Sequence, residues 1–333
     1  MDDKTSTGLL TIEIYALYNN VGVSILKLNP IIEKFGYKFI SVNLADFEKN
    51  FSNLVSLPKD FQSRGTVLIE DGKYAISGEL YDLISKHQSF GHMTFMKNEV
   101  VFLKRIENYE QEIVNNNVDF SLAMNVYSEM YNFNRSLIQY LRLYKTGDIA
   151  SSLEFQINAD TRHITLTVGG PTKVVGHIEF ILTDADVNIL RESLLLNFSS
   201  TPLTELAISN FNLSYEIADL KTKYITLITC LESLINLGSH QITHTVSRHL
   251  SLIISNSIEE FQLNYVRTKQ LYGIRSSIVH GGEIKEDLSK VTNELQDKVR
   301  KAINYCLKLS LNKNGLFEKF NAMGYGLTDT ADS

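Results

Sequence analysis

The sequence is poor in the residues that cross-link or interrupt a polypeptide. It holds only two cysteines and four prolines among 333 residues, and it has no tryptophan. Cys230 and Cys306 both fall within apolar helical patterns rather than in a spaced framework. We therefore expect buried free thiols, and the pattern favours neither a disulfide scaffold nor a zinc cluster.

Long apolar runs and blocks of like charge are also missing. No uncharged stretch approaches the ~18 residues that a membrane-spanning helix needs, and the opening residues lack the basic-then-apolar order of a signal peptide. We therefore expect a cytoplasmic protein that makes no membrane contact. The net charge of −6 does not indicate a generally basic surface, so any RNA site has to be a local basic cleft.

Residues 1–200 show the mixed periodicities of an α/β region. Alternation of apolar residues predicts several short strands. These strands are expected at residues 37–44, 152–158, 163–169 and 177–183. Asp71-Gly72 predicts a hairpin, because this dipeptide suits a two-residue turn, and residues 93–104 resemble a second hairpin about Lys97-Asn98.

Helical spacing is found at two places in this region. Apolar residues recur at threes and fours from about residue 109 to residue 144. A second amphipathic segment begins at Thr183 or Asp184, each of which is a candidate N-cap. A further division of the region near residue 108, where strand spacing gives way to helical spacing, stays open.

Strand patterns disappear beyond the short segment at 199–203, and the rest of the chain has helical spacing. Four helices joined by short loops predict an antiparallel bundle over residues 205–320, followed by a tail at 321–333. The helices are expected within residues 209–238, 241–255, 258–282 and 286–312. The predicted fold class is therefore α+β, with a mixed α/β region followed by an all-α bundle.

The stretch LYGIRSSIVHGG, residues 271–282, carries the most suggestive chemistry. It places four residues between Arg275 and His280 and ends on two glycines. An ordinary helix C-terminus would account for the same residues, because cations there offset the partial negative charge of the last carbonyls. Short motifs of this kind also arise by chance, so the pair needs support from its surroundings.

That support comes from the neighbouring sequence. With CLESLINLG and ITHTVSRHLSLIIS upstream, the stretch resembles the Apea-like branch of the HEPN superfamily (higher eukaryotes and prokaryotes nucleotide-binding) over about residues 205 to 310. The most specific part is LY-x-x-RS-x-IVHG, and the matched residues are Leu271, Tyr272, Arg275, Ser276, Ile278, Val279, His280 and Gly281. Glu232 and Arg248 are less specific matches.

The resemblance implies an all-α HEPN helical bundle that dimerises, so that two Arg-x4-6-His motifs form one composite, metal-independent endoribonuclease site. Arg275 would bind the phosphate and stabilise the transition state, and His280 would transfer protons. The supporting residues would be Ser276, Glu232, Tyr272 and Arg248. The substrate would be RNA, and no cofactor or metal is implied.

Guanidinium and imidazole suit this chemistry independently of the resemblance. Cleavage by the ribose 2′-hydroxyl needs a proton acceptor, a proton donor and a cation that binds phosphate. On a straight helix, however, five residues turn through ~500°, which leaves Arg275 and His280 ~140° apart. Either the helix unwinds before His280, or the working pair is assembled across a dimer.

Two other functions stay open on the sequence alone. One is a non-catalytic dimerisation or nucleotide-binding module in which the Arg-His pair is structural. The other is a metal-dependent hydrolase that uses His240, His244 and His249, although their spacing offers no convincing third ligand. The leading interpretation stays the HEPN endoribonuclease, and a protein with this architecture would be similar to bacterial anti-phage and abortive-infection effectors, which act as toxins. Their N-terminal region would respond to a protein or small-ligand trigger.

Overall fold

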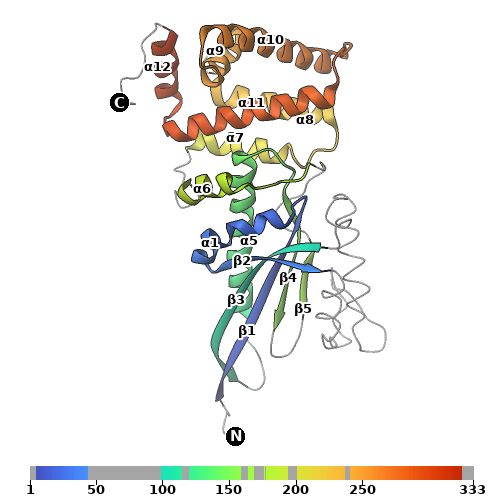
Figure 1. Ribbon diagram of the computed structural model, residues 1–333, viewed down its shortest axis with the longest axis vertical. Helices are drawn as coiled ribbons and strands as arrows, with labels where there is room; N and C mark the ends of the chain where they lie inside the picture. The colour runs from blue at the N-terminus through green and yellow to red at the C-terminus, as the bar shows by residue number, and fades with distance from the viewer. Residues whose placement is uncertain are drawn as a thin grey trace. The chain divides into compact units, whose positions relative to one another are not determined.

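The computed structural model describes residues 5–43, 99–114, 120–158, 164–168, 176, 178–193, 201–236 and 241–324. The chain divides into two compact units, Met1–Leu196 and Asn197–Ser333. The described part of the first unit holds an antiparallel sheet with helices, and that of the second is helical (Figure 1). This combination confirms the predicted α+β class. None of the described helices is both long and apolar enough to cross a membrane.

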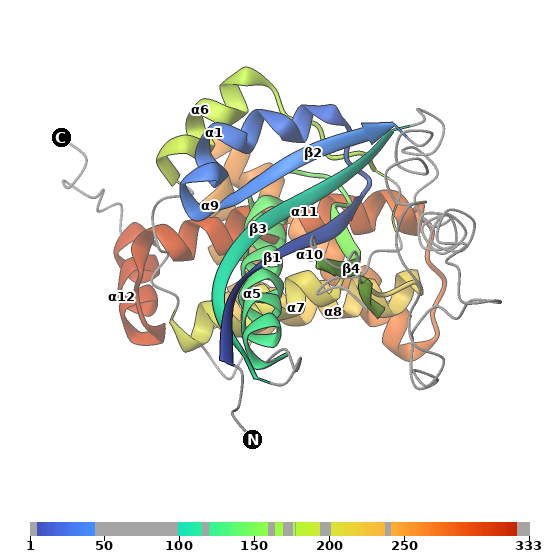
Figure 2. The ribbon, with the colours of Figure 1, turned by 90° about the horizontal axis from the view of Figure 1, so that it is seen from below.

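The N-terminal unit is built on a five-stranded sheet with the strand order β2-β3-β1-β4-β5, in which each pairing is antiparallel. The strands are β1 (Thr5–Asn19), β2 (Tyr37–Asn43), β3 (Glu99–Val114), β4 (Ala150–Asn158) and β5 (Ile164–Val168). The long strand β1 lies at the centre, between β3 and β4 (Figure 2). Residues 14–18 of β1 are all buried, so both faces of the sheet are covered there, because successive side chains point to opposite faces.

A long helix, α5 (Phe120–Tyr144), packs on the sheet and contacts β1, β3 and β4. Its buried residues recur at threes and fours, as expected for the apolar face of a helix. Among them are Met130, Leu137, Ile138 and Leu141. The short elements η1 (Val23–Leu28), α1 (Asn29–Ile32) and η2 (Glu33–Phe35) follow β1, and η1 and α1 add further apolar residues to the same core.

The helix α6 (Asp184–Ser193) begins where the sequence predicted. Thr183 is its N-cap, because the Thr183 hydroxyl accepts the amide of Asp186 at 3.2 Å and the Asp186 carboxylate accepts the amide of Thr183 at 2.7 Å. Lys145, just beyond α5, forms an ion pair with Asp186 at 2.8 Å. The start of α6 is therefore held to the end of α5.

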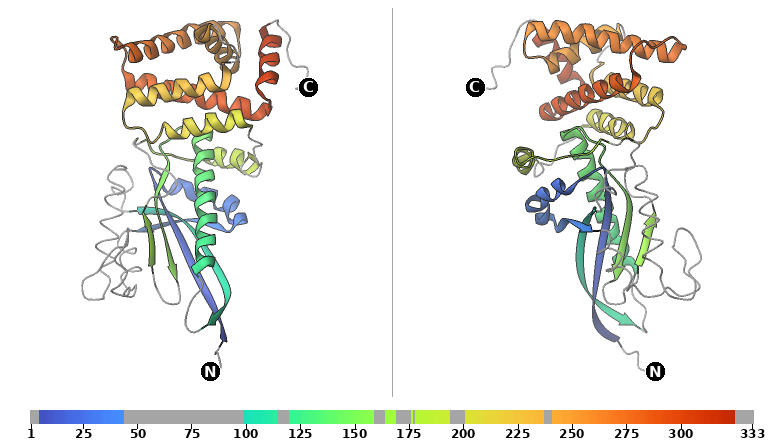
Figure 3. Two further views of the ribbon diagram at one scale, coloured as in Figure 1. Left: turned by 180° about the vertical axis from the view of Figure 1, so that it is seen from behind. Right: turned by 45° about the vertical axis from the view of Figure 1, so that its right-hand side comes forward.

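The C-terminal unit is a layered helical bundle. Its helices are α7 (Pro202–Leu213), α8 (Leu220–Ile235), α9 (Ile242–Ile254), α10 (Ile258–His280), α11 (Leu288–Leu309) and α12 (Lys313–Gly324). The middle layer is α8 with α11, which lie between α7 on one side and α9 with α10 on the other, and α12 packs on α9 (Figure 1, Figure 3). Cys230 and Cys306 are buried free thiols within this core, which confirms the sequence prediction.

Local capping signals set the helix ends of this unit. Asp219, Ser257 and Asp287 are the N-caps of α8, α10 and α11, and each side chain accepts a backbone amide of the first turn. The predicted strands at 37–44, 152–158 and 163–169 and the predicted helices at 241–255, 258–282 and 286–312 are confirmed, with small shifts at their ends.

Two sequence predictions for the N-terminal unit are wrong. β3 passes through residue 108 and runs to residue 114, and α5 begins only at residue 120, so neither a helix start at 109 nor a division at 108 is found. Residues 178–183 form no strand beyond an isolated bridge between Phe180 and Val21. The amide of Ile178 donates to the Asp148 carboxylate at 2.8 Å instead, so a side chain replaces the sheet partner.

The helix expected over 209–238 is also wrong, because a turn at residues 214–219 separates α7 from α8. The Ser214 hydroxyl donates to the Phe211 carbonyl at 2.6 Å, and the buried Tyr215 ring lies edge-on to Phe211 at 5.6 Å. Burial of Tyr215 and the new N-cap at Asp219 offset the helical hydrogen bonds that the break removes. The hairpins expected at residues 71–72 and 97–98 lie outside the described residues.

Candidate functional site

The helix α10 carries the whole Arg-x4-His motif without a break. It begins at the N-cap Ser257 and continues through His280, where Gly281 takes the left-handed conformation with φ of 71°. The amides of Gly281 and Gly282 both donate to the Ser277 carbonyl, which closes the helix end. Of the two alternatives that the sequence left open, unwinding of the helix before His280 is therefore not found, and one helix leaves the motif's cation and imidazole ~140° apart.

Arg275 is held by a carboxylate from the neighbouring helix. The Nε atom of Arg275 lies 3.6 Å from Oε1 of Glu232 on α8, and the Tyr272 hydroxyl donates to the same oxygen at 3.0 Å. The Arg275 side chain is 38% exposed, so one edge of the guanidinium meets Glu232 while part of the group remains in contact with solvent. The structure thus brings three of the predicted site residues into one group.

Tyr272 anchors this group to the bundle core. Its side chain is buried, and burial together with the Glu232 carboxylate holds the pKa of Tyr272 well above its usual range. The phenol therefore stays protonated and donates its hydrogen bond at neutral pH. Because Glu232 is fixed by this bond, it can orient the more exposed Arg275 from a defined position.

His280 and Ser276 lie on the exposed side of α10. His280 is the last residue of the helix, and the neighbouring Val279 is 55% exposed. The imidazole is therefore accessible to a substrate or to a second chain. Within one chain, the exposed imidazole and the Glu232-bound guanidinium face different directions.

Arg248 takes a different position from the one expected of a site residue. Its guanidinium donates to the carbonyl of Phe320 on α12 at 3.1 Å. The next residue, His249, is buried, stacks on the Phe320 ring at 4.3 Å and contacts the Ile235 carbonyl through Nδ1 at 2.8 Å. Both side chains hold α12 against α9, whereas Glu232, Tyr272 and Arg275 contact one another.

The histidines considered as metal ligands are engaged elsewhere. A carbonyl only accepts hydrogen bonds, so Nδ1 of His249 carries its proton, and burial lowers the pKa of this imidazole. His244 contacts the Tyr265 hydroxyl through Nδ1 at 2.7 Å, and His240 lies outside the described residues. Within the described ranges, no group of three His, Cys, Asp or Glu side chains is placed to hold a metal ion.

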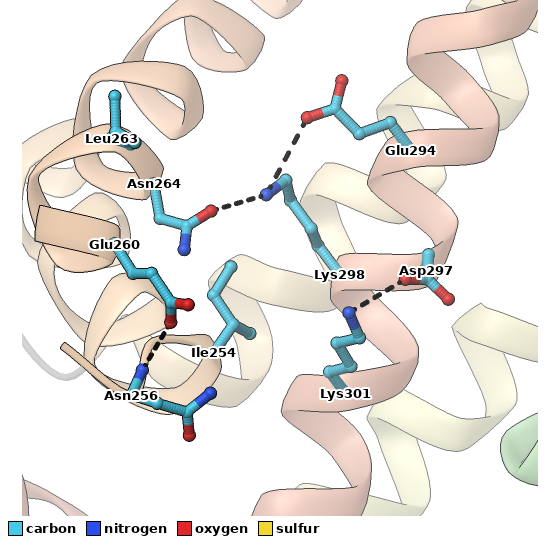
Figure 4. A pocket seen from close by; sticks show the side chains of 9 residues that line it. All are labelled: Ile254, Asn256, Glu260, Leu263, Asn264, Glu294, Asp297, Lys298 and Lys301. Carbon is cyan, nitrogen blue, oxygen red and sulfur yellow. Dashed lines mark hydrogen bonds and ion pairs between the residues drawn. The ribbon is translucent and has the colours of Figure 1, made fainter.

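A pocket of about 460 Å³ lies between the first half of α10 and α11 (Figure 4). Its lysines are paired among its own residues, because Lys298 lies 3.8 Å from Glu294 and Lys301 lies 3.2 Å from Asp297. The lining residues are Ile254, Asn256, Glu260, Leu263, Asn264, Glu294, Asp297, Lys298 and Lys301. No motif residue is among them, so this pocket is separate from the candidate site.

The structure adds residues that the sequence did not single out. Arg267 pairs with Glu286 at 2.8 Å and with Glu294 at 2.7 Å, and so ties the loop after His280 to α11. Tyr265 and Lys269 precede the motif on α10, and Lys269 Nζ lies 5.6 Å from the Tyr265 ring centroid. Their i, i+4 spacing was the signal in the sequence that could have identified this pair.

No family model, curated protein or solved structure matches this chain. Its function therefore has to follow from the geometry and chemistry of α10 and its neighbours, together with the resemblance of the motif.

Proposed function

We propose that this protein is a metal-independent endoribonuclease of HEPN type that cleaves RNA as a homodimer through Arg275 and His280. One observation carries the proposal. The same helix holds a guanidinium that is positioned by Glu232 but still meets solvent, and an exposed imidazole in its last turn. Neither the Arg275 guanidinium nor the His280 imidazole is buried in the core of the bundle.

These two groups suit cleavage by transesterification. The ribose 2′-hydroxyl gives its proton to one imidazole while its oxygen forms a bond to phosphorus. The bond from phosphorus to the 5′-oxygen then breaks, and this oxygen takes a proton from an imidazolium. The guanidinium binds the phosphate oxygens, on which negative charge accumulates. One chain supplies one His280, so a dimer would supply both the acceptor and the donor.

The outer side of α10 supports a dimer. Leu263 and Val266 are 72% and 54% exposed there, and Gly273 has open space where a side chain would stand. Glycine within a helix is ~1 kcal/mol less favourable than alanine, but it lets a second backbone approach closely. Residues 263, 266, 273 and 280 are spaced at threes and sevens, so they share one side of the helix. Two α10 helices that cross near Gly273 would bring both His280 residues within ~10 Å of the crossing point.

Val266→Asp is expected to convert the dimer to a monomer and to abolish cleavage with it. Val266 is exposed in the monomer, so an aspartate there would be solvated, whereas in the dimer two carboxylates would be buried face to face. Light scattering of the full chain measures the mass. Asn293→Asp, an equal gain of charge on the exposed side of α11, is the control and should remain dimeric. A Val266→Asp protein that stays dimeric would place the interface elsewhere.

The full chain is expected to cut a defined single-stranded RNA in EDTA and to leave 2′,3′-cyclic phosphate ends. The reason is that the attacking oxygen belongs to the RNA and not to a metal-activated water. Mass spectrometry of the products identifies the ends. The matched substrate with 2′-O-methyl groups lacks the nucleophile and should remain intact. Products with 3′-hydroxyl ends, or cleavage that EDTA stops, would reject the chemistry.

A non-catalytic dimerisation module is the second candidate. The ion pair between Arg275 and Glu232 favours it, since a structural role for that arginine would need no substrate. RNA that stays intact with a dimeric preparation would support this candidate. The cellular role proposed with the nuclease is that of a bacterial anti-phage or abortive-infection toxin, in which the N-terminal unit responds to a protein or small-ligand trigger. This role rests on the motif resemblance alone.

A further inference from the structure

Two segments in α9 and α10, one of which contains the motif, hold cations but no acidic residue in an otherwise acidic chain. The net charge of the chain is −6, yet no aspartate or glutamate lies between residues 241 and 257 or between residues 261 and 282. Arg248, Arg267, Lys269 and Arg275 all lie in these two segments. Whether one of these cations can bind RNA depends on the carboxylates that other segments place beside it.

Lys269 is the most exposed of these four cations, because Arg248, Arg267 and Arg275 are half-buried and Arg275 is paired with Glu232. Arg267 is neutralised by Glu286 and Glu294, and Arg248 bonds to a carbonyl on α12. Lys269 is exposed, and its Nζ lies over the Tyr265 ring and pairs with no carboxylate of the described residues. A lysine in this situation can bind a phosphate without first breaking an ion pair.

The half-buried Tyr265 ring beside Lys269 also contacts an exposed imidazole, that of His244. The exposed His244 imidazole contacts the Tyr265 hydroxyl at 2.7 Å, and the two rings lie edge to face with centroids 5.8 Å apart. Phe261 stacks on Tyr265 at 6.2 Å and supports it from the previous turn. The orientation of the His244 ring is thus set by a side chain that is itself packed.

We propose that His244, Tyr265 and Lys269 form a subsite for single-stranded RNA beside the cleavage motif. Lys269 binds a backbone phosphate, and the ring of His244, oriented by Tyr265, stacks on a base. This inference rests on the proposed nuclease function. Unstacked bases of single strands bind to aromatic rings and imidazoles, whereas the bases of a duplex are already stacked on one another.

The position of the subsite on α10 fits a substrate that extends from the motif. Residues 265, 269, 276 and 280 point within ~60° of one another around the helix axis, so they share one side. Lys269 precedes His280 by 11 residues, and on a helix this corresponds to ~16 Å. A strand bound by Lys269 would therefore reach the motif after a few nucleotides.

The test measures binding of a labelled single-stranded RNA to full-length His280→Ala protein, which prevents cleavage during the titration. Adding Lys269→Gln is expected to weaken binding about fivefold or more and to make the slope of log K against log salt smaller by about 0.7, because one phosphate contact is lost. Adding His244→Ala is expected to weaken binding about tenfold with no change in that slope, since stacking carries no charge. Lys308→Gln, which removes an exposed lysine from α11, is the matched control and should bind as the parent does.

The outcomes separate the subsite from the nuclease. In otherwise wild-type protein, Lys269→Gln should raise KM for RNA and leave kcat unchanged, since Lys269 binds the substrate away from the reacting atoms. Equal affinities for the Lys269, His244 and Lys308 variants, with RNA still cut by the wild type, would overturn the subsite and leave the nuclease intact. Failure of the wild type to cut or bind RNA would overturn both. Equally tight binding of duplex RNA would overturn the stacking role.

Discussion

His280→Ala is expected to reduce RNA cleavage by at least ~100-fold, the usual effect of losing an acid-base group. The imidazole is exposed at the end of α10 and the left-handed Gly281 closes the helix without it, so the fold should be retained. Initial rates at saturating RNA measure the effect, and circular dichroism checks the fold. Arg275→Lys, which keeps the charge but not the planar donors, should lose a large part of the activity as well. Wild-type rates in a folded His280→Ala protein would remove His280 from the site.

Mixed dimers test whether both imidazoles act in one site. When wild-type and His280→Ala chains exchange freely, a dimer with a single His280 has an acceptor or a donor but not both. Activity per total protein should therefore fall as the square of the wild-type fraction. A linear fall would mean that each chain works alone, and the composite site would be wrong even if His280 is catalytic.

Glu154→Gln is expected to make the N-terminal unit more stable at pH 8 and to raise its stability by only about a quarter as much at pH 5. Glu154 on β4 is fully buried between the sheet and α5, where Asn134 donates to Oε1 at 2.6 Å. The Tyr18 hydroxyl donates in turn to Asn134 at 2.6 Å, and within the described part of the chain Oε2 of Glu154 is a buried atom with no hydrogen-bond partner. Burial raises the pKa of Glu154 to about 7, against the lowering effect of hydrogen bonds from Asn134 and Tyr127.

The sign of the pH effect follows from proton binding. Between the ordinary carboxyl pKa of 4.5 and the folded value of about 7, the folded state keeps a proton that the unfolded chain has released. The contribution of Glu154 to the free energy of unfolding is therefore highest below pH 4.5 and falls as the pH rises. Above pH 7 the protein is less stable than below pH 4.5 by up to ~3 kcal/mol from this group. Glutamine removes the charge and keeps the acceptor for Asn134, so the variant should lack this pH dependence.

Calorimetry of the full chain at pH 5 and pH 8 measures the midpoint of the unfolding transition that shifts between wild type and Glu154→Gln. Glu192→Gln on the exposed side of α6 is the control, because it removes a carboxylate from the same unit without relieving any burial. Should wild type and Glu154→Gln show equal midpoints at pH 8, the carboxylate would be solvated or paired in solution.

The candidate site could be predicted from the sequence only in part. Residues 271–282 named the cation and the imidazole because a motif is a local pattern, and the resemblance pointed to Glu232 forty residues earlier. The contact of Glu232 with both Tyr272 and Arg275 depends on how α8 packs against α10, which no local pattern encodes. Arg248 was assigned to the site for its place in the sequence, but packing of α12 on α9 brings it to Phe320.

The sequence by itself determined the helix ends and strands that depend on residues close together along the chain. Thr183 marks the start of α6, the glycines at 281 and 282 mark the end of α10, and alternation of apolar residues marks β2, β4 and β5. These signals act through hydrogen bonds and side-chain spacing within a few residues. They were read correctly for that reason.

The tertiary structure alone decided where distant segments meet. Residues 209–238 form two helices and not one, because burial of Tyr215 competes with helix propensity. The strand β3 continues past residue 108, because pairing with β1 outweighs the local helical spacing. The tertiary structure also enclosed Glu154 beneath α5 and placed His244 beside Tyr265. Each of these is a contact between residues far apart in sequence, and its free energy exists only once the chain has folded.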